Sequence, residues 1–270
     1  MLVHTHSPHR GAARSRQKDC VDFLCRLHAR GVLACDPSGL QLDLSDEDVR
    51  YTTDAEPGMY DKVCCLNVLA PPPGSVVRFV DLYAAPGMDV VYCMLLNCFG
   101  LGLRVEVTGV SVVRDECDLE RFERMRRNVE AVRALPCDCE VTLVQSSAQD
   151  FCRSYRGPPL DVALISMPWM TSLGEMGSCA GSLREPADML REARALLVSL
   201  ERSGSPPRVV SLMVPFESVG ALASGYGVRE SVLVTKCSSK SGRKISEYFC
   251  HLLERHYSGP AQASGFRFSV

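Results

Sequence analysis

Four consecutive residues, Ser166-Met167-Pro168-Trp169, have the side chains best suited to hold a flat ligand. They follow the apolar run 162–165, which is typical of a buried strand, and Pro168 must end that strand because proline cannot donate to a sheet hydrogen bond. Ligands of open α/β sheets bind beyond the carboxyl ends of the strands. A hydroxyl at the edge of a base and an indole on its face would grip a planar heterocycle. The alternative is a strand-ending turn whose Trp169 packs in the core.

A second candidate site is the turn after an earlier apolar strand. Asp81 ends that strand, a Pro-Gly turn follows, and a helix is expected from Asp89. Such a turn lets a ligand approach backbone N–H groups at the start of a helix. Of the three spaced glycines in the dinucleotide fingerprint only Gly87 is present, which disfavours a phosphate cradle. The alternative is an ordinary strand-to-helix connection.

The elements that must position these residues alternate between strands and helices from Ser75 onward. This alternation predicts an α/β fold with a Rossmann-like, mostly parallel sheet, helices on both faces and a C-terminal antiparallel hairpin. Strands are expected at 76–82, 105–113, 140–144, 160–165, 209–214, 230–235 and 245–253, and helices at 89–99, 119–135 and 186–202.

We expect a flexible basic tail over 1–18, a helical extension over 19–74, the α/β core over 75–257 and a C-terminal tail over 258–270. The tail prediction rests on Arg10, Arg14, Arg16 and Lys18 and on the scarcity of large apolar residues there. In the extension, apolar spacing predicts a helix from Asp19 that Gly31 closes.

The composition bounds the class of protein. A chain of 270 residues with 46% hydrophobic and 23% charged residues is an ordinary globular protein, and a net charge of −2 leaves any nucleic-acid site to a local basic patch. No apolar run approaches the roughly 20 residues that span a bilayer, and the start lacks a secretory signal. The 14 cysteines are therefore expected as reduced thiols in the nucleus or cytoplasm. Without a CxxC pair, no metal site is expected.

The candidate sites fall in the order used by class I S-adenosylmethionine (AdoMet) methyltransferases, whose first motif the Asp81 turn resembles. The strand 105–113 should end near the ribose. Asp150 follows the next strand, where such enzymes often hold the adenine. Ser166 and Trp169 follow the fourth strand, where the methyl acceptor lies.

The set resembles the trimethylguanosine synthase family, which methylates the exocyclic amine of 7-methylguanosine caps on RNA. The family's acceptor motif is Ser-Pro-Pro-Trp, which Ser166, Pro168 and Trp169 match while Met167 replaces the first proline. The resemblance covers about residues 36–253. Three other segments are similar to family motifs: 39–43 to Gly-Ile-Lys-Leu-Asp, 51–53 to an aromatic followed by serine, and 244–249 to Thr-Ile-Thr-Ala-Tyr-Phe.

The resemblance implies AdoMet as cofactor and capped RNA as partner. Trp169 would stack on the cationic 7-methylguanine, an attraction of roughly 0.5–2 kcal/mol. Ser166 would accept a hydrogen bond from the amine, beside Pro168. The implied cofactor contacts are Asp81 at the amino group, Tyr83, Ala85 and Gly87 in the turn, Ser111 at the ribose and Asp150 at the adenine.

A basic loop before the last strand has a role inferred from its charge alone. Lys236, Lys240, Arg243 and Lys244 could meet the phosphates of the cap, and the alternative is a solvated hairpin tip.

The sequence departs from the family pattern at the turn and at the ends of the second and fifth strands. Ala85 and Met88 stand where family members usually have glycine, Ser111 stands where they have an aspartate, and Pro215-Phe216 stand where an arginine would be expected. Glu106, Asp115 and Glu116 would replace Ser111 only with a shifted strand end. Two alternatives therefore stay open: a catalytically inactive methyltransferase-fold module that binds capped RNA, and a methyltransferase for another base or amide nitrogen.

Overall fold

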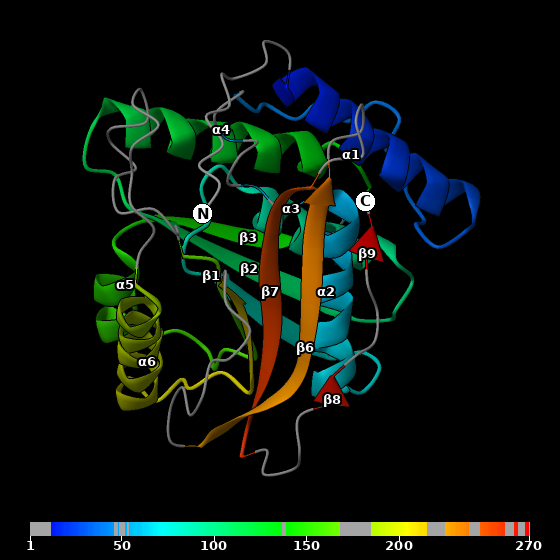
Figure 1. Cartoon of the computed structure of the whole chain (residues 1–270). Coiled ribbons are helices and arrows are strands. Elements are labelled where there is room, and N and C mark those ends of the chain that lie inside the picture. Colours follow the sequence, from blue (N-terminus) through cyan, green and yellow to red (C-terminus); the bar gives the residue numbers. More distant parts are fainter. Residues whose placement is uncertain are drawn as a thin grey trace.

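The computed structural model describes residues 12–45, 48, 52, 54–136, 139–167, 185–214, 225–237, 244–256, 262–263 and 268–269. Its centre is one twisted sheet with helices on both faces (Figure 1). The strands are β1 (Val76–Asp81), β2 (Arg104–Ser111), β3 (Glu140–Gln145), β4 (Val162–Ile165), β5 (Val209–Val214), β6 (Tyr226–Cys237), β7 (Lys244–Arg255), β8 (Gln262–Ala263) and β9 (Phe268–Ser269).

The strand order is β3-β2-β1-β4-β5-β7-β6-β8, with β9 also paired to β6. Strands β1 to β5 are mutually parallel, and β7 runs antiparallel to both β5 and β6. The order reverses between β1 and β4, so the switch point of the sheet lies between those strands, where α/β folds bind ligands. The predicted fold class is confirmed: the sheet is Rossmann-like and mostly parallel, with a C-terminal antiparallel hairpin and helices on both faces.

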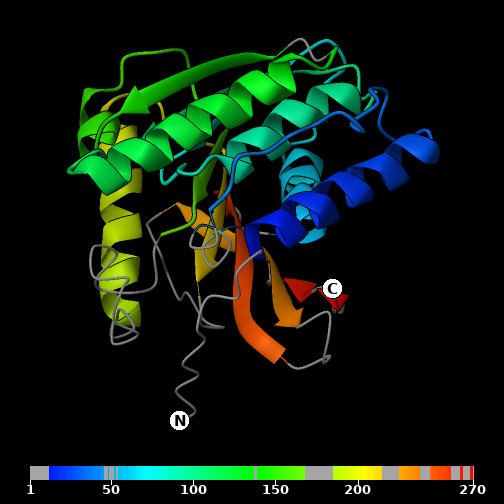
Figure 2. The same ribbon diagram turned by 90° about the horizontal axis from the view of Figure 1, so that it is seen from above.

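Helices cover the two faces of the sheet unequally. Described helices are α1 (Ala12–Ala29), α2 (Ala55–Leu69), α3 (Met88–Leu95) with the 3-10 turn η2 (Leu96–Cys98), α4 (Glu116–Arg133), α5 (Ala148–Ser154) and α6 (Pro186–Arg202). Helices α1 to α4 pack on one face, while α5 and α6 lie side by side on the other (Figures 1 and 2).

Strand β4 is a continuous apolar run because helices cover both faces of the sheet at this strand. Val162 and Leu164 point into the core under α1 to α4, and Ala163 and Ile165 point into the core under α5 and α6. Successive side chains of a strand alternate between faces, so a strand covered on both sides is apolar at every position. The apolar run ends at Ser166, a half-buried residue directly after the strand.

Several predicted boundaries are corrected. Helix α1 begins at Ala12 rather than Asp19, so the tail prediction is wrong for residues 12–18, where Arg16 pairs with Asp54. Residues 1–11 lie outside the described part. Strand β2 ends at Ser111 rather than at residue 113, because its partner β3 ends opposite it at Gln145. Helix α5 was not expected, and β8 and β9 lie within the expected C-terminal tail.

The cysteines mostly follow the expectation of buried thiols. Ten of those in the described residues are free, and burial raises the pKa of the Cys65, Cys93 and Cys250 thiols well above the ordinary value. Such thiols stay protonated and pack as small apolar groups. Cys98 differs from the prediction, because it is disulfide-bonded.

Candidate functional site

The turn between β1 and α3 contacts three other elements: β4, β2 and α4. The Leu82 N–H donates to the Leu164 carbonyl of β4 at 3.1 Å, and the Ala84 N–H donates to the Val110 carbonyl of β2 at 2.9 Å. Gly87 has a φ of 99°, which favours glycine, and a Cβ there would lie 2.8 Å from Met125 Cγ of α4. The one glycine of the turn is therefore required by both its backbone and its neighbour.

Asp81 ends β1 as a buried carboxyl group, with 1% of its surface exposed. Its Oδ1 accepts a hydrogen bond from the Tyr83 N–H at 3.1 Å. Burial, and then the negative charge of Asp89, raise the pKa of Asp81 to about 8, against the opposing effects of the Tyr83 N–H and the Lys62 ammonium. A cation arriving beside Asp81 would favour its ionised form.

Lys62 of α2 is fully buried and supplies the positive charge of this region. Its Nζ lies 2.7 Å from Asp61 Oδ2 and 2.7 Å from Asp89 Oδ1. Burial alone would lower the pKa of Lys62, but the two carboxylates raise it well above the ordinary value. Asp61 in turn accepts hydrogen bonds from Ser211 Oγ of β5 at 2.7 Å and from Cys250 Sγ of β7 at 3.2 Å. The Lys62–Asp89 ion pair thus fixes α2 against the first turn of α3, and the hydrogen bonds to Asp61 fix it against the sheet.

The sequence predictions missed Lys62. A lysine one residue after an aspartate on a helix usually lies on a solvated face, and the sequence offered only the neighbouring apolar spacing of Tyr60, Val63 and Leu66 as a sign of burial.

The second strand ends with a hydroxyl rather than a carboxylate. Ser111 is 7% exposed, and its Oγ lies 3.5 Å from the Val112 carbonyl, a long contact. Two of the acidic residues considered as substitutes are engaged elsewhere, and the third, Glu116, is exposed in the first turn of α4. Glu106 pairs with Arg78 in the middle of β2 at 2.9 Å, and Asp115 accepts the Asp118 N–H at the start of α4 at 2.9 Å. Ser111 therefore remains the polar side chain at the end of β2.

Asp150 lies in the first turn of α5, after β3. Its backbone N–H donates to Ser147 Oγ at 3.0 Å, and its carboxylate accepts the Ser147 hydroxyl at 2.7 Å and pairs with Arg153 at 3.2 Å. These contacts form an N-cap that stabilises α5. The predicted adenine contact of Asp150 stays a prediction.

Ser166 follows β4 directly, beside the Asp81 turn. Its hydroxyl oxygen is buried and has no hydrogen-bond partner within the described ranges. Buried polar atoms are nearly always paired, so an unpartnered one is a candidate ligand contact. Met167 is buried at 1% exposure. Pro168 and Trp169 lie outside the described residues, as do Tyr51, Thr53, Pro215 and Phe216.

The basic residues of the last hairpin are placed only in part. Lys236 lies opposite Ser246, and Lys244 lies opposite Cys237, so β6 and β7 bring both lysines to the same end of the hairpin. Lys240 and Arg243 lie outside the part that the structure describes. The phosphate role of the four residues stays a prediction.

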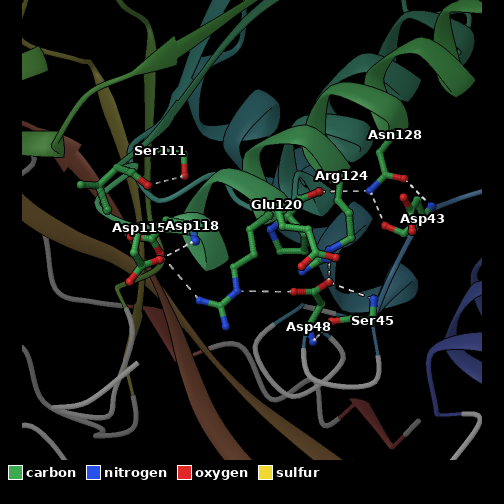
Figure 3. A network of polar contacts seen from close by, with 12 residues as sticks. Asp43, Ser45, Asp48, Ser111, Asp115, Asp118, Glu120, Arg124 and Asn128 are labelled. Carbon is green, nitrogen blue, oxygen red and sulfur yellow. Dashed lines mark hydrogen bonds and ion pairs between the residues drawn. The ribbon is translucent and has the colours of Figure 1, made fainter. Parts of the chain in front are cut away.

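A polar network joins α4 to the segment before α2, and the sequence predictions also missed it (Figure 3). Arg124 Nε lies 2.8 Å from Asp48 Oδ2, with both side chains largely buried, and Asp48 Oδ2 also accepts the Ser45 N–H at 2.9 Å. Asn128 is fully buried and binds the backbone of Asp43. The available signal was a polar residue, Asn128, in the apolar stripe of α4.

Among the described residues no group of three or more His, Cys, Asp or Glu side chains is arranged to hold a metal ion. No described helix has the length and the apolar composition to cross a bilayer.

Comparisons with known proteins give structural likeness only. No protein-family model and no curated protein matches the chain. The N-terminal domain of human METTL16 is 14% identical, with 88% of this chain and 81% of that chain covered and a TM-score of 0.49. A Pyrococcus horikoshii protein named as an RNA methyltransferase is 14% identical, covering 91% and 98%, with a TM-score of 0.48. A Listeria monocytogenes protein named as a class I AdoMet-dependent methyltransferase is 12% identical, covering 99% and 74%, with a TM-score of 0.48. These values are too low to transfer a site or a substrate.

Proposed function

We propose that the chain is an AdoMet-dependent RNA methyltransferase that acts on the exocyclic amine of 7-methylguanosine caps. The observation that carries the proposal is the pairing of two polar groups at the switch point of the sheet. Asp81 is a buried carboxyl group at the end of β1, and Ser166, after the adjacent strand β4, presents a buried hydroxyl with no hydrogen-bond partner among the residues that the structure describes. The Ser-x-Pro-Trp sequence, similar to the family's acceptor motif, begins at that hydroxyl.

The residues of the turn fit the amino-acid end of the cofactor. Asp81 accepts a hydrogen bond from the Tyr83 N–H and carries a raised pKa that a bound ammonium group would lower again. The fit at the ribose is weaker, since Ser111 offers a neutral hydroxyl where a carboxylate would accept two hydroxyl groups. AdoMet would supply a methyl group on a sulfonium. Transfer of that methyl group needs no covalent protein intermediate.

The chain's own residues then have positioning roles. Asp81 holds the ammonium group, Ser166 accepts an N–H of the acceptor amine and so directs the nitrogen lone pair, and Trp169 stacks on the base. Displacement at a methyl group proceeds in line, and holding two reactants in that geometry accounts for much of the rate. Each side chain therefore acts by orientation and by exclusion of water rather than as an acid or base.

The test uses the full chain with labelled AdoMet and two RNAs that differ only in the presence of a 7-methylguanosine cap. Methyl transfer to the capped RNA alone, inhibited by 7-methylguanosine triphosphate, is the expected result. Trp169→Phe should retain part of the activity, and Trp169→Ala should lose cap binding by about tenfold or more. Absence of S-adenosylhomocysteine (SAH) binding by calorimetry would refute the proposal. Transfer that the cap analogue does not inhibit would indicate another base or amide nitrogen as acceptor.

A second candidate function is a non-catalytic module that binds capped RNA. The specific observation in its favour is Ser111, whose hydroxyl replaces a charged acceptor of the ribose. Losing hydrogen bonds to a charged group costs about 1.5–3 kcal/mol each. This module would bind the cap analogue through Trp169 and would show neither SAH binding nor methyl transfer.

A further inference from the structure

Asn128 is a fully hydrogen-bonded side chain at the edge of the proposed cofactor site. It lies in α4 with none of its surface exposed. Its Oδ1 accepts the Asp43 N–H at 2.6 Å, and its Nδ2 donates to the Asp43 carbonyl at 3.0 Å and to the Pro86 carbonyl at 3.1 Å. An amide group has two donors and one acceptor atom, so Asn128 uses both donors and the acceptor on two segments far apart in the sequence.

The first of these segments is residues 40–45, which we call the strap. Leu40 and Leu42 are buried at 4% exposure, so apolar contacts hold the strap on the protein. The Asn128 amide binds both the N–H and the carbonyl of Asp43, as the backbone of a neighbouring strand would. Arg127 adds an exposed ion pair to the Asp43 side chain at 2.6 Å. Asn128 thus fixes the backbone of the strap, while Arg127 touches only its surface.

The second segment is the cofactor turn, residues 82–87. Asn128 binds the carbonyl of Pro86, and one turn earlier on the same helix Met125 packs against Gly87 so closely that a Cβ would not fit. The direction of the Pro86–Gly87 peptide is therefore set by α4. Residues 82–87 present the backbone groups nearest to Asp81, which the proposed function assigns to the cofactor ammonium.

We propose that Asn128 is a positioning residue that couples the strap to the cofactor turn. One side-chain amide holds both segments, so a single Asn128 rotamer makes the hydrogen bonds to the turn and to the strap. A ligand that orders the turn lowers the cost of ordering the strap, and by linkage the strap strengthens binding of that ligand. This inference rests on the proposed function, because it takes AdoMet or SAH as the ligand of the turn.

The experiment measures SAH affinity by calorimetry and backbone hydrogen exchange in the strap and the turn, with and without SAH. In the unaltered protein SAH should slow exchange in both segments. In Asn128→Ala, SAH affinity should fall by on the order of tenfold, a usual size for coupling between sites, and SAH should protect residues 82–87 without protecting residues 40–45. Arg127→Ala is the matched control, since it removes a contact to the same Asp43 without touching the turn; its affinity and its protection pattern should match those of the unaltered protein.

The outcomes separate the two proposals. If the unaltered protein does not bind SAH, the proposed function fails and the coupling fails with it. If it binds SAH but the strap gains no protection, the coupling alone is wrong, and this measurement needs no variant to fold. If Asn128→Ala is folded by circular dichroism and binds SAH as tightly as the unaltered protein, the coupling is likewise overturned while the proposed function stands.

Discussion

Cofactor affinity should depend steeply on pH because of Asp81. The folded protein holds this carboxyl with a pKa of about 8, so it is protonated below that pH and ionised above it. Only the ionised form attracts an ammonium group. SAH affinity should therefore rise by about tenfold per pH unit from pH 6 to pH 8, roughly a hundredfold in all, and then level off.

Asp81→Asn provides the assay's internal reference. Asparagine cannot titrate, so the variant should bind SAH about as well as the unaltered protein at pH 6 and about a hundredfold more weakly at pH 9. The amine of the ligand titrates identically with both proteins, so the ratio of the two calorimetric affinities isolates Asp81. Lys62→Met should move the midpoint to higher pH, because the Lys62 ammonium lowers the pKa of Asp81. A ratio that stays constant between pH 6 and pH 9 would refute the assignment of Asp81 to the ammonium group.

Three further substitutions test the surroundings of the site. Arg124→Met should lower the free energy of unfolding in urea by about 3 kcal/mol, because it leaves the Asp48 carboxylate buried without its nearest cation. Gly87→Ala should lower the melting temperature more than Gly102→Ala: both glycines have positive φ, which costs alanine about 1–2 kcal/mol, but only Gly87 has a close neighbour. Ser111→Asp should tighten SAH binding by about tenfold by restoring a charged acceptor for the ribose hydroxyls, and unchanged calorimetric affinity would place the ribose elsewhere.

Elements with local signals were predicted well from the sequence. Helix α6 and strand β5 match their predicted ranges, 186–202 and 209–214, residue for residue. Helix α6 begins with a proline, which is favoured at a first position, and shows an apolar stripe, while β5 is a continuous buried run. Helix α5 was missed because seven residues carry little periodicity, although Ser147 and Asp150 have the spacing of an N-terminal capping pair.

The sequence indicated candidate site residues only where a single segment carries the signal. Asp81 and Ser166 were singled out because Asp81 ends an apolar strand and Ser166 follows one, and their binding roles stay predictions. Lys62 and Asn128 gave no such signal, because each binds a partner that only the fold brings close: Lys62 pairs with Asp89 of α3, and Asn128 binds a residue 85 positions away. A buried polar side chain is explained by the groups that pair with it, and those groups are brought together only by the tertiary fold.

The structure of the turn shows that the departures from the family pattern differ in their effect on the proposed cofactor site. Met88, which stands where family members have glycine, is 3% exposed and packs in the core beneath α1 to α4. The turn keeps glycine at position 87, where the backbone and Met125 both demand it. Ala85 lies between these constraints and is half-buried. The methionine at position 88 therefore packs in the core and does not decide between the two proposed functions. The choice between an enzyme and a non-catalytic module depends on Ser111, because the proposed ribose contact there is a neutral hydroxyl instead of a carboxylate.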